Sequence, residues 1–180
     1  MPRLIDRDGP AEDRWTTLGA DDALPASGAV IVPLDRLEEA VDAVFDSAAD
    51  SGLELGVHVP NNADPLRLRA GFDRLALISV EFPAFADGRG FSLGHRLRAL
   101  GFKGRLRASG HVIADQFAYL LACGFDELAL RDDVAERQPV EHFLKALKRI
   151  SAGYQRGIPG RRSILDARRA ARQGTNAAPR

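Results

Sequence analysis

The stretch that decides the fold runs from Leu75 to Arg131 and reads LALISVEFPAFADGRGFSLGHRLRALGFKGRLRASGHVIADQFAYLLACGFDELALR. Short apolar runs typical of strands alternate in it with longer segments that have the apolar spacing of helices. We expect strands over 75–82, 104–109 and 127–131, separated by helices over 92–100 and 112–123. This order predicts βαβ units, and therefore a parallel sheet whose strands are joined by crossover helices.

The same alternation continues on both sides of this stretch. Gly28 to Pro33 (GAVIVP) and Leu53 to Val59 predict two further strands, with a helix that begins at Asp35 between them, and Pro139 opens a last helix. The fold class is therefore α/β, with about five mainly parallel strands flanked by helices. We expect a flavodoxin-like three-layer sheet. An incomplete β/α barrel is the alternative, because local patterns do not give the order of the strands.

The strand expected over 104–109 has an alternating pattern. Leu106 and Ala108 fall on one side of it, and Arg105 and Arg107 fall on the other. Charged side chains are seldom fully buried unless they are paired. The pattern therefore predicts a strand at a sheet edge or in a half-exposed position.

The chain divides into three parts in this interpretation. Residues 1–27 form an N-terminal extension in which Trp15 is expected to act as a lid over one edge of the core. Residues 28–156 form a single α/β domain, a size typical of one domain. Residues 157–180 form a basic tail, which we expect to be partly disordered because its composition cannot build a core.

Composition excludes several classes of protein. The net charge is zero and 28% of the residues are charged, as in ordinary globular proteins. No apolar run approaches the roughly 20 residues that cross a bilayer, and the N-terminus lacks the apolar core of a signal peptide. A single cysteine, Cys123, excludes a disulfide within one chain. We expect a cytoplasmic protein whose partners include neither a membrane nor nucleic acid.

A ligand site is expected outside the carboxyl ends of the strands, because helix N-termini face the crevice there. The loop from Asp87 to Ser92 is the first candidate for binding a small anion. Gly88 and Gly90 let backbone N–H groups turn toward a ligand, Arg89 offers a bidentate fork, and Ser92 is a candidate N-cap. A tight turn followed by a capped helix, with an exposed arginine, is the alternative interpretation of the same residues.

Further polar residues follow the third and fourth expected strands. Glu81 could act as an acid or base if it is buried, although a structural ion pair with one of three nearby arginines (Arg89, Arg105, Arg107) is the favoured interpretation. A metal site made of His58, Glu81 and His111 would need three neighbouring strands, and we expect no metal. The remaining candidates for ligand contacts are Ser109, His111, Asp115 and Gln116. No motif indicates a cofactor, and Cys123 is expected to be a buried packing residue.

The order and spacing of several short pieces resemble one bacterial family. The matching pieces are Val80-Glu81-Phe82-Pro83, Asp87-Gly88-Arg89-Gly90 with Ser92, Arg107-Ala108, Gly110, Asp115-Gln116 and Cys123-Gly124-Phe125-Asp126. The family has no known function, and its members are labelled as oxidoreductases of sulfite reduction. The resemblance covers roughly residues 28–155, and His111 departs from it, because many members of the family carry aspartate at that position.

The resemblance implies a pathway, assimilatory sulfate and sulfite reduction, and leaves three functions open. The first is an accessory protein that binds a small anion or sulfonucleotide together with the sulfite reductase or sulfonucleotide reductase. The second is an enzyme of the same pathway, a putative oxidoreductase by the family's label, with Glu81 as acid or base. The third is a non-catalytic interaction module unrelated to redox chemistry, whose basic tail contacts a partner.

Overall fold

The structure, a computed structural model, describes residues 3–46, 52–149, 165, 168–169 and 171–172. Its strands are β1 (Arg3–Asp6), β2 (Pro10–Ala11), β3 (Trp15–Thr17), β4 (Gly28–Pro33), β5 (Leu53–Val59), β6 (Leu75–Phe82), β7 (Arg105–Gly110) and β8 (Glu127–Leu130). Its helices are α1 (Leu37–Asp46), α2 (Pro65–Arg69), α3 (Arg89–Ala99), α4 (Ala114–Ala122), α5 (Asp132–Arg137) and α6 (Val140–Arg149), and a 3-10 turn (Leu34–Arg36) precedes α1. Most of the basic tail lies outside the described residues. The contact with a partner that was predicted for the tail therefore also falls outside them.

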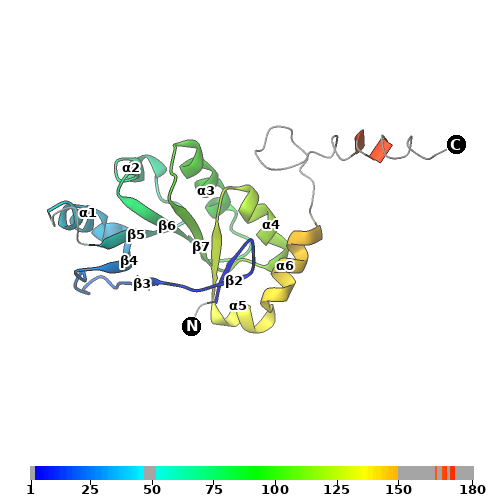
Figure 1. The fold of residues 1–180 in the computed structure, drawn as a ribbon, viewed down its shortest axis with the longest axis horizontal. Helices are drawn as coiled ribbons and strands as arrows, with labels where there is room; N and C mark the ends of the chain where they lie inside the picture. The colour runs from blue at the N-terminus through cyan, green and yellow to red at the C-terminus, as the bar shows by residue number, and fades with distance from the viewer. Residues whose placement is uncertain (1–2, 47–51, 150–164, 166–167, 170, 173–180) are drawn as a thin grey trace.

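All the strands of the described residues lie in one eight-stranded sheet with the order β2-β1-β8-β7-β6-β5-β4-β3, curled into a half-barrel (Figure 1). The prediction of an α/β fold with a mainly parallel sheet is confirmed, because β3 to β8 pair in parallel with one another and only β1 and β2 are antiparallel. The flavodoxin-like order is wrong. It requires β4 to lie between β5 and β6, whereas β5 pairs with both β4 and β6. The half-barrel corresponds to the alternative, an incomplete β/α barrel.

One face of this sheet is covered by helices. Each crossover from β4 to β8 advances by one strand, and right-handed crossovers in the same direction place their helices on the same face. Strand residues such as Val57, Ile78 and Leu106 are fully buried there in one apolar cluster, to which all of α1 to α6 contribute side chains. We call this the helix-covered face.

The opposite face carries no helix from the described chain, and we call it the helix-free face. Successive strand residues alternate between the two faces. The cross-strand pairs Gly56–Leu77, Ser79–Arg107 and Arg107–Glu127 place these side chains on the helix-free face. Its apolar cluster is small and consists of Trp15, Ile31 and Leu77.

The N-terminal segment joins the two edges of the sheet across the helix-free face. A tight turn in which the Asp6 carboxylate accepts hydrogen bonds from the N–H groups of Asp8 and Gly9 links β1 to β2, and β1 pairs with β8 at one edge. The chain from Asp13 to Thr17, which we call the crossing segment, then reaches β4 at the other edge. The division of the chain at residue 27 stays a prediction, but the segment before it contributes β1, β2 and β3 to the sheet.

The crossing segment is fixed by ion pairs and by one aromatic ring. The Asp13 carboxylate accepts hydrogen bonds from both Nη atoms of Arg107, at 2.9 and 2.8 Å, and Arg14 forms a bidentate pair with Glu54. Trp15 is buried and lies over Gly56, where an added Cβ would come within 3.1 Å of the indole ring. Trp15 therefore covers part of this face, as expected of a lid.

The prediction that the strand 104–109 lies at a sheet edge is wrong, and of its two arginines only Arg105 fits the alternative of a half-exposed position. This strand, β7, is internal, between β6 and β8, and Arg107 is 3% exposed. Arg107 is buried because it pairs with Asp13 and with Glu127 on β8, whose Oε1 accepts from Arg107 Nε at 2.7 Å.

In the part of the chain that is described, no helix has the length and apolar character needed to cross a membrane.

Candidate functional site

Two groups of polar residues lie at the carboxyl end of the sheet, where parallel α/β folds bind ligands. One is a row on the helix-free face formed by side chains of β5, β6 and β7. The other lines a cleft beside the N-terminus of α4, formed with α5 and α6. The crossing segment lies near the opposite end, because Trp15 pairs with Ala29 at the start of β4.

The row consists of His58, Ser79, Glu81 and Ser109. His58 is the cross-strand neighbour of Ser79, and Glu81 is that of Ser109. His58 Nδ1 and Ser79 Oγ are 3.2 Å apart and share a hydrogen bond whose direction depends on the tautomer. Burial lowers the pKa of His58, and the Glu81 carboxylate only partly offsets this effect. The ring is therefore neutral near pH 7, which leaves it able to accept a proton.

Glu81 does not form the expected ion pair. It is exposed at the end of β6, whereas Arg89 pairs with Asp87, and Arg105 and Arg107 both pair with Glu127. The interpretation as an ion pair is wrong because Glu127 on β8 lies beside both strand arginines and pairs with them in place of Glu81. No group of three or more His, Cys, Asp or Glu residues suited to a metal ion occurs among the described residues.

The loop before α3 is held mainly by Asp87. Its carboxylate accepts hydrogen bonds from the backbone N–H of Arg89 and from Arg89 Nε and Nη2, and Asn61 donates another at 2.8 Å. These bonds, the side-chain bond from Arg89 first, hold the pKa of Asp87 well below its usual range. Gly90 lies against the Phe82 ring, where an added Cβ would be 2.6 Å away.

Ser92 is not the N-cap of this helix. α3 begins at Arg89 with Gly88 as its N-cap, four residues before Ser92, so Ser92 is exposed within the first turn. The carboxylate of Asp87, the residue before the N-cap, accepts from the N–H of Arg89. The tight turn and the exposed arginine match the alternative interpretation, but Ser92 does not supply a cap. Anion binding by Gly88, Arg89, Gly90 and Ser92 stays a prediction.

The chain after β7 turns sharply toward α4. Gly110 has φ +121°, and an added Cβ there would lie 2.4 Å from the carbonyl oxygen of Phe82, so only glycine fits. The next residue, His111, donates its N–H to that oxygen at 2.7 Å. Its Nε2 atom is buried without a hydrogen bond among the described residues, although Asp133 Oδ2 lies 3.5 Å away.

Gln116 connects two segments at the carboxyl end. Its side-chain oxygen accepts from the N–H of Ile113, and its Nε2 donates to the carbonyl oxygen of Phe85 at 2.7 Å. The loop after β6 is thereby tied to the N-terminus of α4. Asp115, one residue before, is exposed and lines the cleft.

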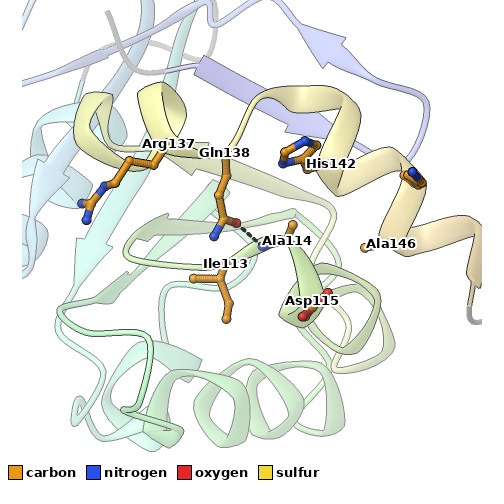
Figure 2. Close-up of a pocket in the computed structure, with 8 residues that line it drawn as sticks. Ile113, Ala114, Asp115, Arg137, Gln138, His142 and Ala146 are labelled. Atoms are coloured by element: carbon orange, nitrogen blue, oxygen red, sulfur yellow. Dashed lines mark hydrogen bonds between the residues drawn. The ribbon is translucent and has the colours of Figure 1, made fainter.

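The cleft has a volume of about 470 Å³ (Figure 2). It is lined by Ile113, Ala114, Asp115, Arg137, Gln138, His142, Lys145 and Ala146. Gln138, in the link between α5 and α6, accepts a hydrogen bond from the N–H of Ala114 at 2.8 Å, which joins the two sides. Arg137 and Lys145 supply two fixed positive charges against the single negative charge of Asp115, so the lining is positive overall.

Asp133 fixes the arginine at this cleft. Its side-chain and backbone oxygens accept from Arg137 at 2.9 and 2.8 Å, and Arg131 donates to the same carboxylate. Desolvation raises the pKa of Asp133, but Arg131, His111 and Arg137 together outweigh it and lower the pKa. The carboxylate therefore stays ionised and holds Arg137 in place.

The predicted site residues are thus divided between separate places. Ser109 and Glu81 are in the row, Asp115 is in the cleft, and Arg89 is the first residue of α3. Sequence reasoning missed Arg137, His142 and Lys145. Their only sequence signal is their position on the polar side of amphipathic helices, which is also typical of a solvated surface.

A family profile described as a bacterial protein of unknown function, DUF934, matches residues 56–165. The chain belongs to this family. The DUF934 match includes the row, the loop before α3 and the whole cleft, and it begins after the crossing segment. A comparison with curated proteins gave no match.

Cys123, inside the DUF934 region, is buried, and desolvation raises the pKa of its thiol although a hydrogen bond with Tyr119 opposes this.

Proposed function

We propose that this protein is a non-catalytic accessory protein of assimilatory sulfate and sulfite reduction, which binds a small anion in the cleft beside α4. The observation that carries the proposal is the gathering of Arg137, His142 and Lys145 around a hollow at a helix N-terminus. Sulfite, sulfate and sulfonucleotides are all anions. The pathway rests on the sequence resemblance, and the cleft supports the anion.

The electrostatics of the cleft favour an anion. The positive end of the α4 dipole adds to the side-chain charges. Two N–H groups at this end are already bound by glutamine side chains, so the cationic side chains supply most of the attraction. Arg137 is held through Nε and Nη2, and its Nη1 makes no hydrogen bond within the described residues. A preformed cation with an available donor suits an oxyanion.

The cleft fits an anion better than the loop before α3 does. The guanidinium of Arg89 already makes three hydrogen bonds to the carboxylate of Asp87, through Nε and Nη2. An anion at this fork would have to displace or share that carboxylate. Both places can be tested in one experiment, because each has an exposed arginine that can be replaced without opening the core.

Titration calorimetry and melting temperature with sulfite, sulfate and adenosine phosphosulfate test the anion site. We expect at least one anion to bind, to stabilise by about 2.7 kcal/mol at a hundred times its Kd, and to bind more weakly at high salt. Arg137→Gln should weaken binding at least tenfold. Arg67→Gln, at an exposed arginine of α2 outside the cleft, is the matched control and should bind as wild type. Binding lost in Arg89→Ala instead would move the site to the loop, and no binding of any anion would end the proposal.

Deletion of the gene tests the pathway. We expect the deletion strain to grow poorly with sulfate as sole sulfur source and normally with cysteine. Co-purification of the intact protein with sulfite reductase or sulfonucleotide reductase at micromolar concentration tests the partner. Normal growth on sulfate, in a strain without a second copy of the gene, would remove the pathway from the proposal.

The row at the carboxyl end favours a second candidate, an enzyme of the same pathway with Glu81 as acid or base. The supporting observation is that the neutral His58 and the exposed Glu81 share the row at the carboxyl end of the strands. Barrel enzymes place their catalytic groups at this end. Turnover of sulfite or adenosine phosphosulfate should then fall about 10²–10⁴-fold in Glu81→Gln. Glu38→Gln, at an exposed carboxylate of α1, should keep the wild-type rate. Equal rates in both variants would remove Glu81 from the reaction.

A further inference from the structure

The cleft continues into a second chamber. The second hollow has a volume of about 370 Å³ and shares Ile113, Arg137 and Gln138 with the first. Its other wall residues are Phe85, His111 and Val134. The two chambers therefore adjoin, with a cation and an amide at their boundary.

The second chamber differs in chemistry from the first. Three apolar side chains, Phe85, Ile113 and Val134, reach it from the loop after β6, the start of α4 and α5. Phe85 is 58% exposed, although a single exposed apolar residue would need no explanation. Here it converges with two others on a hollow that has few polar groups at fixed positions, which is the usual composition of a small-molecule site.

The apolar wall is held in place without a ligand. The carbonyl oxygen of Phe85 accepts from Gln116 Nε2, and Gln116 also binds the N–H of Ile113. Gln138 fixes the α5–α6 link to Ala114, and Asp133 fixes Arg137. A preformed site loses less entropy on binding than one that must be ordered.

The volumes are large for an inorganic anion. A water molecule takes about 30 Å³ of liquid volume, so a tetrahedral oxyanion displaces only a few waters. The first chamber alone exceeds this several times, and both chambers fall within the range of about 300–1,000 Å³ found for organic ligands.

We infer that the ligand of this cleft is an organic anion that carries a planar apolar group, with its anionic end at Arg137 and Lys145 and its planar group against Phe85 and Ile113. The inference rests on the proposed anion site and specifies its ligand. A monoester of an oxyacid with an aromatic group has this chemistry. Arg137, at the boundary, contacts both parts.

Two probes with the same anionic head separate the contributions. Calorimetry compares phenyl phosphate with methyl phosphate, because they differ only in the planar group. We expect phenyl phosphate to bind at least tenfold more tightly, and Arg137→Gln to weaken both. Phe85→Ala should reduce the preference to less than threefold. Leu66→Ala, at an apolar residue of α2 that is 57% exposed and outside the cleft, is the matched control and should keep it.

The outcomes distinguish this inference from the proposed function. Equal binding of the two esters and of inorganic phosphate, all weakened by Arg137→Gln, would overturn the planar group and leave the anion site intact. A preference for phenyl phosphate that survives Phe85→Ala would overturn the assignment to the second chamber. Absence of binding by all three phosphates would overturn this inference, and the proposed function would then be decided by the titrations with sulfite, sulfate and adenosine phosphosulfate. Because Phe85 is exposed, an unchanged melting temperature of Phe85→Ala shows that the variant is folded.

Discussion

The two faces of the sheet are covered by different chemistry. On the helix-covered face, α1 to α6 bury apolar side chains against apolar strand residues in one large cluster. On the helix-free face, the crossing segment is held by Asp13–Arg107 and Arg14–Glu54 pairs around a small cluster at Trp15. When an apolar side chain in a core is truncated, the loss of stability grows with the volume of the cavity that is left. When one partner of a buried ion pair is removed, the other charge stays buried without compensation, which is strongly destabilising.

This difference has a consequence for the carboxyl end. The crossing segment ties the helix-free face near the amino ends of the strands, while the polar row lies toward their carboxyl ends. Charged groups on this face therefore occupy two kinds of environment, one buried and one exposed. Arg107 and Glu127 are buried and mutually paired, and Glu81 is exposed.

The largest expected effect comes from breaking the buried pair. Arg107→Leu leaves Glu127, which is 2% exposed, without one of its two arginine partners. Such a loss costs about 3–5 kcal/mol, and we expect the lower end because Arg105 still pairs with Glu127. The double variant Arg107→Leu/Glu127→Leu should recover more than half of the loss, since no buried carboxylate remains. Urea unfolding measures both free energies.

Leu97→Ala, on the helix-covered face, is the control for this pair. It removes a fully buried side chain of α3 and should cost about 2–5 kcal/mol. Adding Glu127→Leu should give additive losses, because the two residues lie on opposite faces. If the Arg107→Leu/Glu127→Leu double variant instead loses the sum of its single losses, the ionic description of the helix-free face is wrong.

A smaller effect is expected where the crossing segment packs most tightly. A Cβ at Gly56 would lie 3.1 Å from the Trp15 ring and 3.2 Å from Ile31, so Gly56→Ala should cost about 1–2 kcal/mol through overpacking. Trp15 is the only tryptophan, and its fluorescence should shift to longer wavelength as the ring moves outward. Gly71→Ala is the matched control, since its nearest neighbour would be 3.7 Å away. An unshifted emission in Gly56→Ala would mean that the ring does not depend on this contact.

Much of the fold follows from local sequence, but the arrangement of the strands does not. Apolar runs such as GAVIVP and the helical spacing between them predict the parallel α/β class, and this is confirmed. The order of strands depends on long-range packing, because the same strands and crossovers serve a doubly wound sheet and a half-barrel. Arg107 shows the same limit. Its alternation suggested exposure, and its partner Asp13 is 94 residues away.

The candidate site was predictable only in part for a related reason. Residues that follow strands, such as Glu81 and His111, could be placed at the carboxyl end once strands were identified. The cations of the cleft come from α5, which the sequence did not reveal, and from α6. Arg137 and Lys145 become part of a site only when α6 packs beside α4, and helical periodicity does not encode that contact.

The smallest expected effect tests the state of His58 at the carboxyl end. Burial lowers its pKa below the ordinary value of 6.5, so in the folded state the ring stays neutral where the unfolded chain takes up a proton. Stability linked to His58 is therefore complete above pH 6.5 and is lost as the pH falls below it toward the folded-state pKa. The melting temperature of His58→Asn should thus fall less than that of wild type between pH 7.5 and pH 5. His95→Asn, at an exposed histidine of α3, is the control and should run parallel to wild type. If the melting temperature of His58→Asn falls more steeply than that of wild type, Glu81 stabilises the charged form of the ring. The row would then hold an ion pair between His58 and Glu81, and not a neutral proton acceptor beside a free carboxylate.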